Sequence, residues 1–507
     1  MTIYMKQKLE RGAGILMPIS ALPSPYGIGT LGKESYRFAD FLERVGCRYW
    51  QVLPVGPTSF GDSPYQSVSA FSGNPYFIDL DYLVEEKLLL QEEVNQYQWQ
   101  KEEDSIDYSM IYNHRFDVLK LAFKRSNHRT QNTYREFCKK NEYWLEDYSL
   151  YMAIKTHFDH KEWLLWEEDI RYRKKEAVTR YKILLQEDID FWKFCQYKFR
   201  EQWDQLKAYV SSKKIHIIGD IPIYVALDSA DVWVHGDLFE LDERKNPIHV
   251  AGVPPDAFSE DGQRWGNPLY RWDVIEKQEF SWWKERMKLS ASLYDIIRID
   301  HFIGVVNYYS IPITCPTAAI GEWRKGPGKK LTDAILESIG SAKIIAEDLG
   351  VVTSNVKKLM KETGFPGMKI LEFSLDGSTE NDNLPHNYPS SNLVVYTGTH
   401  DNETLVGFLK EKPKHEILFA CKYFNVTHVD ELPNAMMRAL YSCIADVAMV
   451  QMQDILKLDN KARMNFPSTI GTNWKWRLKK NQYADINEVT LLELAILYNR
   501  VPKVSKE

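Results

Sequence analysis

Short apolar runs, rich in isoleucine and valine, alternate along the chain with longer stretches in which apolar residues recur at helical spacing. Most runs stop at glycine, proline or an acidic residue, which is typical of buried parallel strands followed by helices. The runs predict strands at residues 14–18, 49–54, 215–221, 296–299, 343–346, 368–373, 393–397 and 462–465. Eight parallel strands can close a barrel, so we expect an α/β fold of the (β/α)8 TIM type.

The spacing between the predicted strands is uneven. One long helix is predicted over 187–213, where one face carries Trp192, Cys195, Phe199, Trp203, Leu206 and Val210. Residues at about 82–187 are charged, aromatic and helical in pattern, too long for a simple crossover, and predict a helical insertion. Residues at about 224–283 are rich in loop signals and predict a second insertion that covers the active site. We expect a single decorated catalytic domain over 1–507.

Composition excludes several classes of partner. The chain has 64 basic and 70 acidic residues, and this balance argues against nucleic acid or an anionic membrane as a partner. No apolar stretch approaches the ~18 residues of a membrane span. The first ten residues lack the apolar block of a secretory signal, so we expect a cytoplasmic protein. Six scattered cysteines without a Cys-x-x-Cys pair give no reason to expect a disulfide framework, a metal or a cofactor.

Three acidic residues each follow a predicted strand closely. They are Asp300, Glu347 and Asp401, in the sequences IRIDH, IIAED and GTHDN. The carboxyl ends of the strands of a β/α barrel meet at one face, where such enzymes place their chemistry. Because the three residues come from different strands, we expect their carboxyl groups to share one site.

Such a set of carboxyl groups suits the cleavage of a glycosidic bond. Retaining cleavage needs a carboxylate that attacks the anomeric carbon and a carboxylic acid, about 5 Å away, that protonates the leaving oxygen. Arg298 lies two residues before Asp300 on the same face of the strand and would favour its ionised form, whereas the apolar run before Glu347 would keep that residue protonated. Asp401, beside His400, could bind sugar hydroxyls and stabilise an oxocarbenium-like transition state.

Motifs along nearly the whole chain, from Gly14 to Arg477, resemble those of one enzyme family. The most specific are SPYQS at 63–67, SAFSGNP at 69–75, GDIPIYV at 219–225, the loop from 252 to 268, RIDHF at 298–302, AEDLG at 346–350 and GTHDN at 398–402. In these motifs the chain resembles the amylomaltases, or 4-α-glucanotransferases, of glycoside hydrolase family 77, whose barrel belongs to the α-amylase clan.

The resemblance implies that Asp300 is the nucleophile, Glu347 the general acid/base and Asp401 the stabiliser of the transition state. The residues that it implies for substrate binding are Ser63, Tyr65, Asp220, Trp265, Asn267, Arg298, His400 and Asn465. Of these, the residues at 265 and 267 belong to a loop that would fold over bound glucan. The substrates would be α-1,4-glucans and maltooligosaccharides, with glucose or another glucan as acceptor.

Two positions depart from the family pattern. Ile303 stands where an arginine usually follows His-Phe, and Ser468 stands after Pro467 where glycine is usual. Neither position is a catalytic carboxylate, so the departures bear on acceptor contacts and loop geometry rather than on the reaction.

Several other interpretations remain open from the sequence. The same barrel could be an α-glucan hydrolase, or a catalytically silent glucan-binding protein that kept the cleft. Asp220 taken alone could be a hydrogen-bonding residue of a turn at the barrel rim. A metal site is a weaker alternative, because the histidines and carboxylates at 300, 301, 400 and 401 lack the usual metal-ligand spacings.

Overall fold

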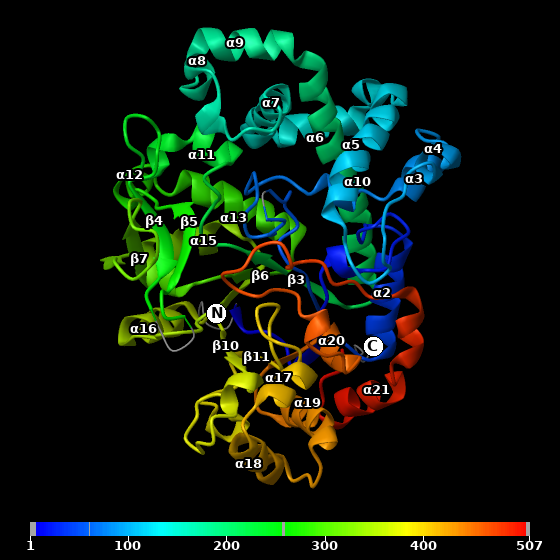
Figure 1. Ribbon diagram of the computed structural model, residues 1–507, viewed down its shortest axis with the longest axis vertical. Coiled ribbons are helices and arrows are strands. Elements are labelled where there is room, and N and C mark those ends of the chain that lie inside the picture. Colours follow the sequence, from blue (N-terminus) through cyan, green and yellow to red (C-terminus); the bar gives the residue numbers. More distant parts are fainter. Residues whose placement is uncertain (1–6, 60, 256–258, 503–507) are drawn as a thin grey trace.

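The computed structural model describes residues 7–59, 61–255 and 259–502, and its core is a barrel of eight parallel strands (Figure 1). The strands are β1 (Gly12–Leu16), β2 (Tyr49–Gln51), β3 (His216–Ile221), β6 (Ile296–Ile299), β9 (Lys343–Ala346), β10 (Gly367–Ile370), β11 (Leu393–Tyr396) and β12 (Val447–Gln451). They are hydrogen-bonded in the order β10-β11-β12-β1-β2-β3-β6-β9. The amide of Ala346 donates to the carbonyl of Pro366 at 3.0 Å, so the two ends of this order nearly meet. The expected (β/α)8 architecture is confirmed.

Inward-pointing apolar side chains fill the barrel. The cluster that they form contains Leu9, Tyr49, Ile218, Ile296, Ile345, Met368, Ile370, Val394, Tyr396, Val447 and Met449. Side chains on a strand alternate between the two faces, so residues two positions further along stay on the inner face. For this reason the residues that follow Ile218, Ile345 and Ile370 by two positions reach the carboxyl end of the barrel from inside. Those residues are Asp220, Glu347 and Glu372.

The predicted strand at 462–465 is wrong, and the eighth strand is β12. Residues Asn460–Ala462 form a short 3-10 helix, and no strand includes 463–465. β12 instead pairs with β1 on one side and with β11 on the other. Its sequence, VAMVQ, follows helix α19 (Leu432–Ser442) closely, and periodicity alone cannot separate such a short apolar run from a helix.

In the sequence, a group of helices lies between β2 and β3, and it occupies the top and upper right of Figure 1. They are α3 (Leu80–Glu85), α4 (Gln91–Asn95), α5 (Tyr108–Arg125), α6 (Asn132–Lys140), α7 (Glu142–His157), α8 (Glu168–Arg171) and α9 (Lys175–Leu184). The long helix predicted at 187–213 is confirmed as α10 (Gln186–Ser212). Its predicted apolar face is buried, because Trp192, Phe199 and Trp203 are each no more than 4% exposed.

A second, antiparallel sheet lies beside the barrel and was not predicted. Its strands are β4 (His249–Val253), β5 (Gln263–Pro268), β7 (Asn307–Pro312) and β8 (Glu322–Lys325), in the order β5-β4-β7-β8. The loop-rich appearance of 224–283 hid two of these strands, since Gly252, Gly262 and Gly266 interrupt the apolar pattern. Part of the loop from 252 to 268, at 256–258, lies outside the described residues.

The remaining helices surround the barrel and its second sheet (Figure 1). They are α2 (Lys33–Arg44), α11 (Ala230–Val234), α12 (Trp272–Lys277), α13 (Ser281–Leu293), α14 (Ile303–Val306), α15 (Lys329–Ser338), α16 (Ser354–Thr363), α17 (Leu405–Glu411), α18 (Lys414–Phe424), α20 (Met452–Ile455) and α21 (Glu488–Leu497). None of the described helices has the length and apolar character that a membrane crossing requires. Residues 1–6, which belong to the segment in which no secretory signal was predicted, lie outside the described part of the chain.

Candidate active site

Arg298 joins two acidic residues at the ends of neighbouring strands. Its Nη1 donates to Oδ1 of Asp300 at 2.8 Å and to the two carboxylate oxygens of Asp220 at 2.7 and 2.8 Å. The sheet register pairs Asp220 of β3 with Arg298 of β6, and Asp300 follows two residues later. The side chain of Asp300 is 29% exposed, whereas those of Arg298 and Asp220 are buried. The guanidinium therefore holds Asp300 beside a positive charge and leaves part of its carboxylate accessible.

Two main-chain amides fix the carboxyl group of Glu347. Strands β6 and β9 are neighbours, and Asp300 and Glu347 directly follow their last paired residues. The amide of His301 donates to Oε2 of Glu347 at 2.6 Å, and the amide of Leu349 donates to Oε1 at 2.8 Å. Both carboxyl oxygens are thus engaged, so the group cannot rotate without losing a hydrogen bond.

The surroundings of Glu347 favour its protonated form. Burial raises the pKa of Glu347 to about 8, and the negative charge of Asp300 adds to this increase. Arg298 and the two amide hydrogen bonds lower the pKa and offset part of the rise. The raised pKa of Glu347 therefore favours a protonated carboxyl group just after β9, next to Asp300 just after β6.

His400 and Asn465 hold Asp401 at the same end of the barrel. Nε2 of His400 lies 3.3 Å from Oδ2 of Asp401, and Nδ2 of Asn465 donates to Oδ1 at 2.6 Å. Burial by itself would raise the pKa of Asp401, but His400 and the hydrogen bonds outweigh it and bring the pKa below its usual range. The side chain of Asp401 is 44% exposed, so it is an ionised and accessible carboxylate.

Tyr65 connects these groups to an aromatic wall, which is formed by the rings of Tyr65, His400 and Trp474. Its hydroxyl donates to Oδ2 of Asp220 at 2.9 Å. Its ring stacks on His400, with centroids 5.1 Å apart and planes at 17°. The indole of Trp474 lies 5.9 Å from the Tyr65 ring and 6.0 Å from the His400 ring. The structure therefore links Tyr65, Asp220, Arg298 and His400 through side-chain contacts.

Ser63 and Asn267 occupy the loops beside Tyr65. Oγ of Ser63 accepts a hydrogen bond from the amide of Tyr65 at 3.3 Å, so it shapes the turn that carries this ring. Oδ1 of Asn267 accepts from Nε2 of Gln66 at 3.0 Å, while its Nδ2 donates to the carbonyl of Val225 at 2.8 Å. Asn267 is 4% exposed and thus ties three segments together.

Trp265 lies on β5, next to the segment that carries the catalytic candidates. Its Nε1 donates to Oε1 of Gln263 at 3.1 Å, and its carbonyl accepts from Nε2 of Gln66 at 3.4 Å. The indole and the His301 ring meet edge to face, with centroids 4.8 Å apart and planes at 85°. Strand β5 therefore contacts both the loop of Tyr65 and the residue after Asp300.

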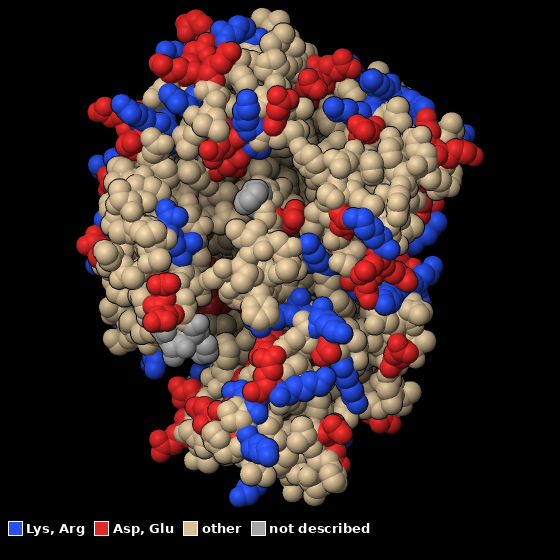
Figure 2. Space-filling view, viewed as in Figure 1, with Lys and Arg blue, Asp and Glu red and all other residues tan. Residues whose placement is uncertain are grey.

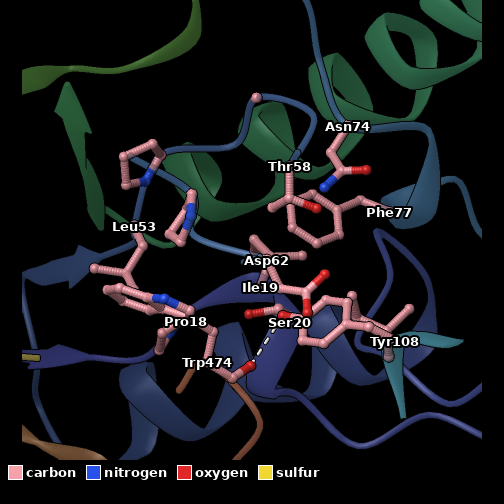
Figure 3. A pocket seen from close by; sticks show the side chains of 14 residues that line it. Pro18, Ile19, Ser20, Leu53, Thr58, Asp62, Asn74, Phe77, Tyr108 and Trp474 are labelled. Carbon is pink, nitrogen blue, oxygen red and sulfur yellow. Dashed lines mark hydrogen bonds between the residues drawn. The ribbon is translucent and has the colours of Figure 1, made fainter. Parts of the chain in front are cut away.

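Figure 3 shows a pocket that Trp474 shares with residues from the first part of the chain. The hydroxyl of Tyr108 donates to the carbonyl of Trp474 at 2.9 Å, which is the dashed line in the figure. The lining includes Leu53, Phe77 and the carboxyl group of Asp62, whose pKa is raised by burial. This pocket lies next to the aromatic wall, and the hydrogen bond from Tyr108 helps to fix the backbone of Trp474.

Sequence reasoning missed three residues of the site. Arg463 donates from Nη2 to the carbonyl of Asp401 and from Nε to the carbonyl of Asn465, both at 2.8 Å. Gln66 and Trp474 contact predicted residues as described above. Gln66 stands inside the SPYQS motif, and Trp474 lies near the end of the stretch that carries the family resemblance, so their positions were the available signal. Arg463 fell within the stretch that was assigned to the wrong strand.

The face of the molecule shown in Figure 2 is hollowed near its centre. Uncharged side chains, drawn in tan, make up most of the walls of this hollow. Among the described residues, no group of three or more histidine, cysteine or acidic side chains could hold a metal ion. A barrel that holds two carboxyl groups at the ends of neighbouring strands has the arrangement found in enzymes that break and remake glycosidic bonds.

Comparisons with known proteins agree with this class. The sequence profile of the family described as 4-alpha-glucanotransferase, glycoside hydrolase family 77, matches residues 17–482. A 4-alpha-glucanotransferase of Clostridium butyricum is 47% identical over 486 residues, which cover 96% of this chain and 100% of that protein. The one of Thermus thermophilus is 45% identical over 481 residues, with 93% and 95% covered.

A solved structure agrees as closely. An amylomaltase from Streptococcus agalactiae in complex with acarbose superposes with a TM-score of 0.94 at 39% identity, covering 97% of this chain and 100% of that one. The chain belongs to the 4-alpha-glucanotransferase family. The family resemblance given above is thereby confirmed, and the chain is a glycosyl-transferring enzyme that acts on α-glucans.

Proposed function

We propose that this enzyme transfers segments of α-1,4-glucan by a retaining double displacement, with Asp300 as nucleophile, Glu347 as general acid/base and Asp401 as stabiliser of the transition state. The observation that carries the proposal is geometric: Asp300 and Glu347 directly follow the last paired residues of neighbouring strands, and both carboxyl groups are held by hydrogen bonds. Residues 1–507 would act as one catalytic domain, with the insertion at about 224–283 covering the site.

In the first half of the reaction a carboxylate oxygen of Asp300 bonds to the anomeric carbon, and the bond from that carbon to the leaving sugar breaks. The proton of Glu347 passes to the departing glycosidic oxygen. Arg298 keeps the attacking carboxylate oriented through its 2.8 Å contact with Oδ1. The product of this half is a covalent glucosyl-enzyme and a released sugar.

In the second half Glu347 acts as a base. Bonding of Asp300 to the sugar removes the negative charge that helped to raise the pKa of Glu347, so the newly ionised Glu347 becomes a stable form. It takes the proton of an acceptor hydroxyl, whose oxygen attacks the anomeric carbon and releases Asp300. Two opposite inversions give retained configuration.

The other predicted residues would bind the sugar at the point of cleavage. Asp401 is ionised and accessible, so it can accept hydrogen bonds from sugar hydroxyls while positive charge develops on the ring. Tyr65 and His400 present a stacked aromatic pair beside it. Ser63, Asn267 and Asn465 act mainly by holding these side chains in place.

Transfer rather than hydrolysis requires that an acceptor sugar outcompete water. A bound acceptor has a high effective concentration, and a covered site admits less water. Maltooligosaccharides would serve as donors, and glucose or another glucan would serve as acceptor. Trp265 is placed to contribute to the cover, because it lies on β5 against His301. A cytoplasmic location remains a prediction from the sequence.

The test is incubation with maltotriose alone, followed by separation of the products. We expect glucose and longer maltooligosaccharides from the wild type, and no turnover from Asp300→Asn. Net formation of reducing ends would favour the alternative function, an α-glucan hydrolase. Turnover that persists in Asp300→Asn would exclude the proposed nucleophile, and inhibition by a chelator would point to a metal.

A second measurement addresses the loop. Trp265→Ala should raise the ratio of hydrolysis to transfer, because the cover over the acceptor side is weakened. The matched control is Trp323→Ala, which removes an indole that is 49% exposed from β8 of the same sheet. An unchanged ratio of hydrolysis to transfer in Trp265→Ala would show that Trp265 does not help to exclude water from the site.

A further inference from the structure

His301, the residue after Asp300, has an unusual backbone. Its φ is +50°, in the left-handed region that residues with a side chain rarely adopt. A conformation of this kind is strained and persists only where the surroundings enforce it. The two features that could enforce it are the hydrogen bond to Glu347 and the packing of the imidazole ring.

The first feature is the contact with Glu347. The left-handed turn directs the amide of His301 to Oε2 of Glu347 at 2.6 Å. The next amide, that of Phe302, donates to the main-chain carbonyl of Glu347 at 3.0 Å. Two successive amides therefore hold the side chain and the backbone of the same residue, which an extended backbone at 301 could not do.

The second feature is the seat of the ring. The imidazole meets Trp265 of β5 edge to face, with centroids 4.8 Å apart. On another side Gly304 approaches it closely enough that an added Cβ would lie 3.1 Å from Cδ2. Burial lowers the pKa of His301 to about 4, so the ring is uncharged and acts through its shape at neutral pH.

We infer that His301 is a positioning residue for Glu347, and that its ring, seated against Trp265, holds the left-handed turn that aims the amide at Oε2. Through this contact β5 takes part in orienting the general acid/base as well as in covering the site. The inference rests on the proposed function of Glu347 and adds to it the residue that sets its geometry.

The pH dependence of activity gives a readout that a merely structural role would leave unchanged. The charged and titratable groups that face Glu347 are Asp300 and Arg298 from β6 and Tyr396 from β11. None of them is altered by a change at residue 301. A hydrogen bond to the ionised form of an acid lowers its pKa, so a loosened amide should raise the pKa of Glu347.

The test is the pH profile of kcat/KM for transfer from maltotriose in His301→Ala. The amide remains but the ring is lost, so we expect the alkaline limb to move to higher pH by about 0.5–1 unit, the equivalent of one hydrogen bond. We also expect kcat to fall on the order of 10-fold, since the acid is less well oriented. Lys214→Ala is the matched control, because Lys214 has a φ of +61° on the surface, away from the site.

Trp265→Ala, alone and combined with His301→Ala, tests whether the His301 ring acts through its contact with Trp265. If the ring acts through Trp265, the single and double variants should show the same shift of the alkaline limb as His301→Ala. Shifts that add in the double variant would show that the two residues act independently and would overturn the role of the Trp265 contact. An alkaline limb that stays in place in His301→Ala would overturn the role of His301. His301→Gly repeats the measurement with a residue that adopts the left-handed backbone freely, in case the alanine variant does not fold.

A separate variant distinguishes this inference from the proposed function. Glu347→Gln should abolish transfer if Glu347 is the general acid/base. Retained activity would overturn both the proposed function and the inference. An inactive Glu347→Gln together with an unmoved limb in His301→Ala would overturn only the inference.

Discussion

Nη1 of Arg298 lies 2.8 Å from Oδ1 of Asp300, and the same nitrogen reaches both carboxylate oxygens of Asp220. One guanidinium nitrogen thus balances two carboxylates, of which Asp220 is fully buried. Because Arg298 is itself buried, the loss of either carboxylate partner would leave its charge poorly compensated and would be destabilising.

Replacement of Arg298 by lysine should therefore be harmful although it keeps the charge. Lysine is shorter, so its ammonium nitrogen would not reach the place that Nη1 occupies between the two carboxylates, and we expect kcat for transfer to fall by about 100-fold. The rate of glucose release from maltotriose measures the effect. Arg271→Lys, at an exposed arginine, should keep the wild-type rate, and an active Arg298→Lys would show that the geometry of the guanidinium is unimportant.

The pKa of Glu347 predicts the alkaline side of the pH profile. The first half of the proposed reaction uses protonated Glu347, and the pKa of this residue is raised to about 8. Activity should therefore be retained up to neutral pH and fall as pH rises through about 8. The measurement is kcat/KM for maltotriose between pH 5 and 10. A fall centred near pH 5 would mean that Glu347 is ionised in the resting enzyme.

Glu372 should make the fold less stable at higher pH. This residue follows β10, is 2% exposed, and its Oε1 has no hydrogen-bond partner among the described residues. Burial raises the pKa of Glu372 well above its usual value, with a further contribution from Asp454. The unfolded chain loses this proton first, so the folded state binds more protons and stability falls as pH rises above about 4.5.

The variant Glu372→Gln removes this titration. We expect the difference in Tm between pH 5 and pH 8 to be smaller in Glu372→Gln than in the wild type. Glu243→Gln, at an exposed glutamate, serves as control and should keep the wild-type difference. An equal difference in Glu372→Gln and the wild type would show that Glu372 does not stay protonated in the fold.

Ser468 offers a stabilising substitution. It is exposed and has a φ of +65°, a backbone in which glycine is free of strain, which explains why glycine is usual at this position in the family. Ser468→Gly should raise the free energy of unfolding by up to about 1 kcal/mol, because relief of strain exceeds the added entropy of the unfolded chain. Urea denaturation measures the change. Ser211→Gly, within helix α10, should have the opposite sign, and a destabilised Ser468→Gly would contradict the argument.

The sequence predicted the parts of the structure in which pattern and chemistry coincide. Seven barrel strands were placed because a short apolar run was followed by glycine, proline or an acidic residue, or by a helical pattern. The links between Arg298, Asp300 and Asp220 follow from alternation along β6 and from its register with β3. Periodicity on a strand is enough to bring such neighbours together.

The parts that were missed depend on contacts between distant segments. Strand β12 is apolar except for its last residue, Gln451, and only its pairing with β1 and β11 distinguishes it from the end of a helix. The second sheet joins β4 and β5 to β7, across the intervening strand β6, a pairing that no local pattern reveals. The contact of Trp265 with His301 arises from the same long-range arrangement, so sequence reasoning could name both residues but not relate them.

The paired residues of β6 and β9 end one position before Asp300 and Glu347. The spacing of the two carboxyl groups is thus set by a pair of hydrogen-bonded strands, not by the loops that surround them. Loops on this face can therefore vary in length without moving the strand ends that carry the two residues. Under the proposed mechanism, a change from retention to inversion would need a wider gap between the two carboxyl groups, and so a displaced strand.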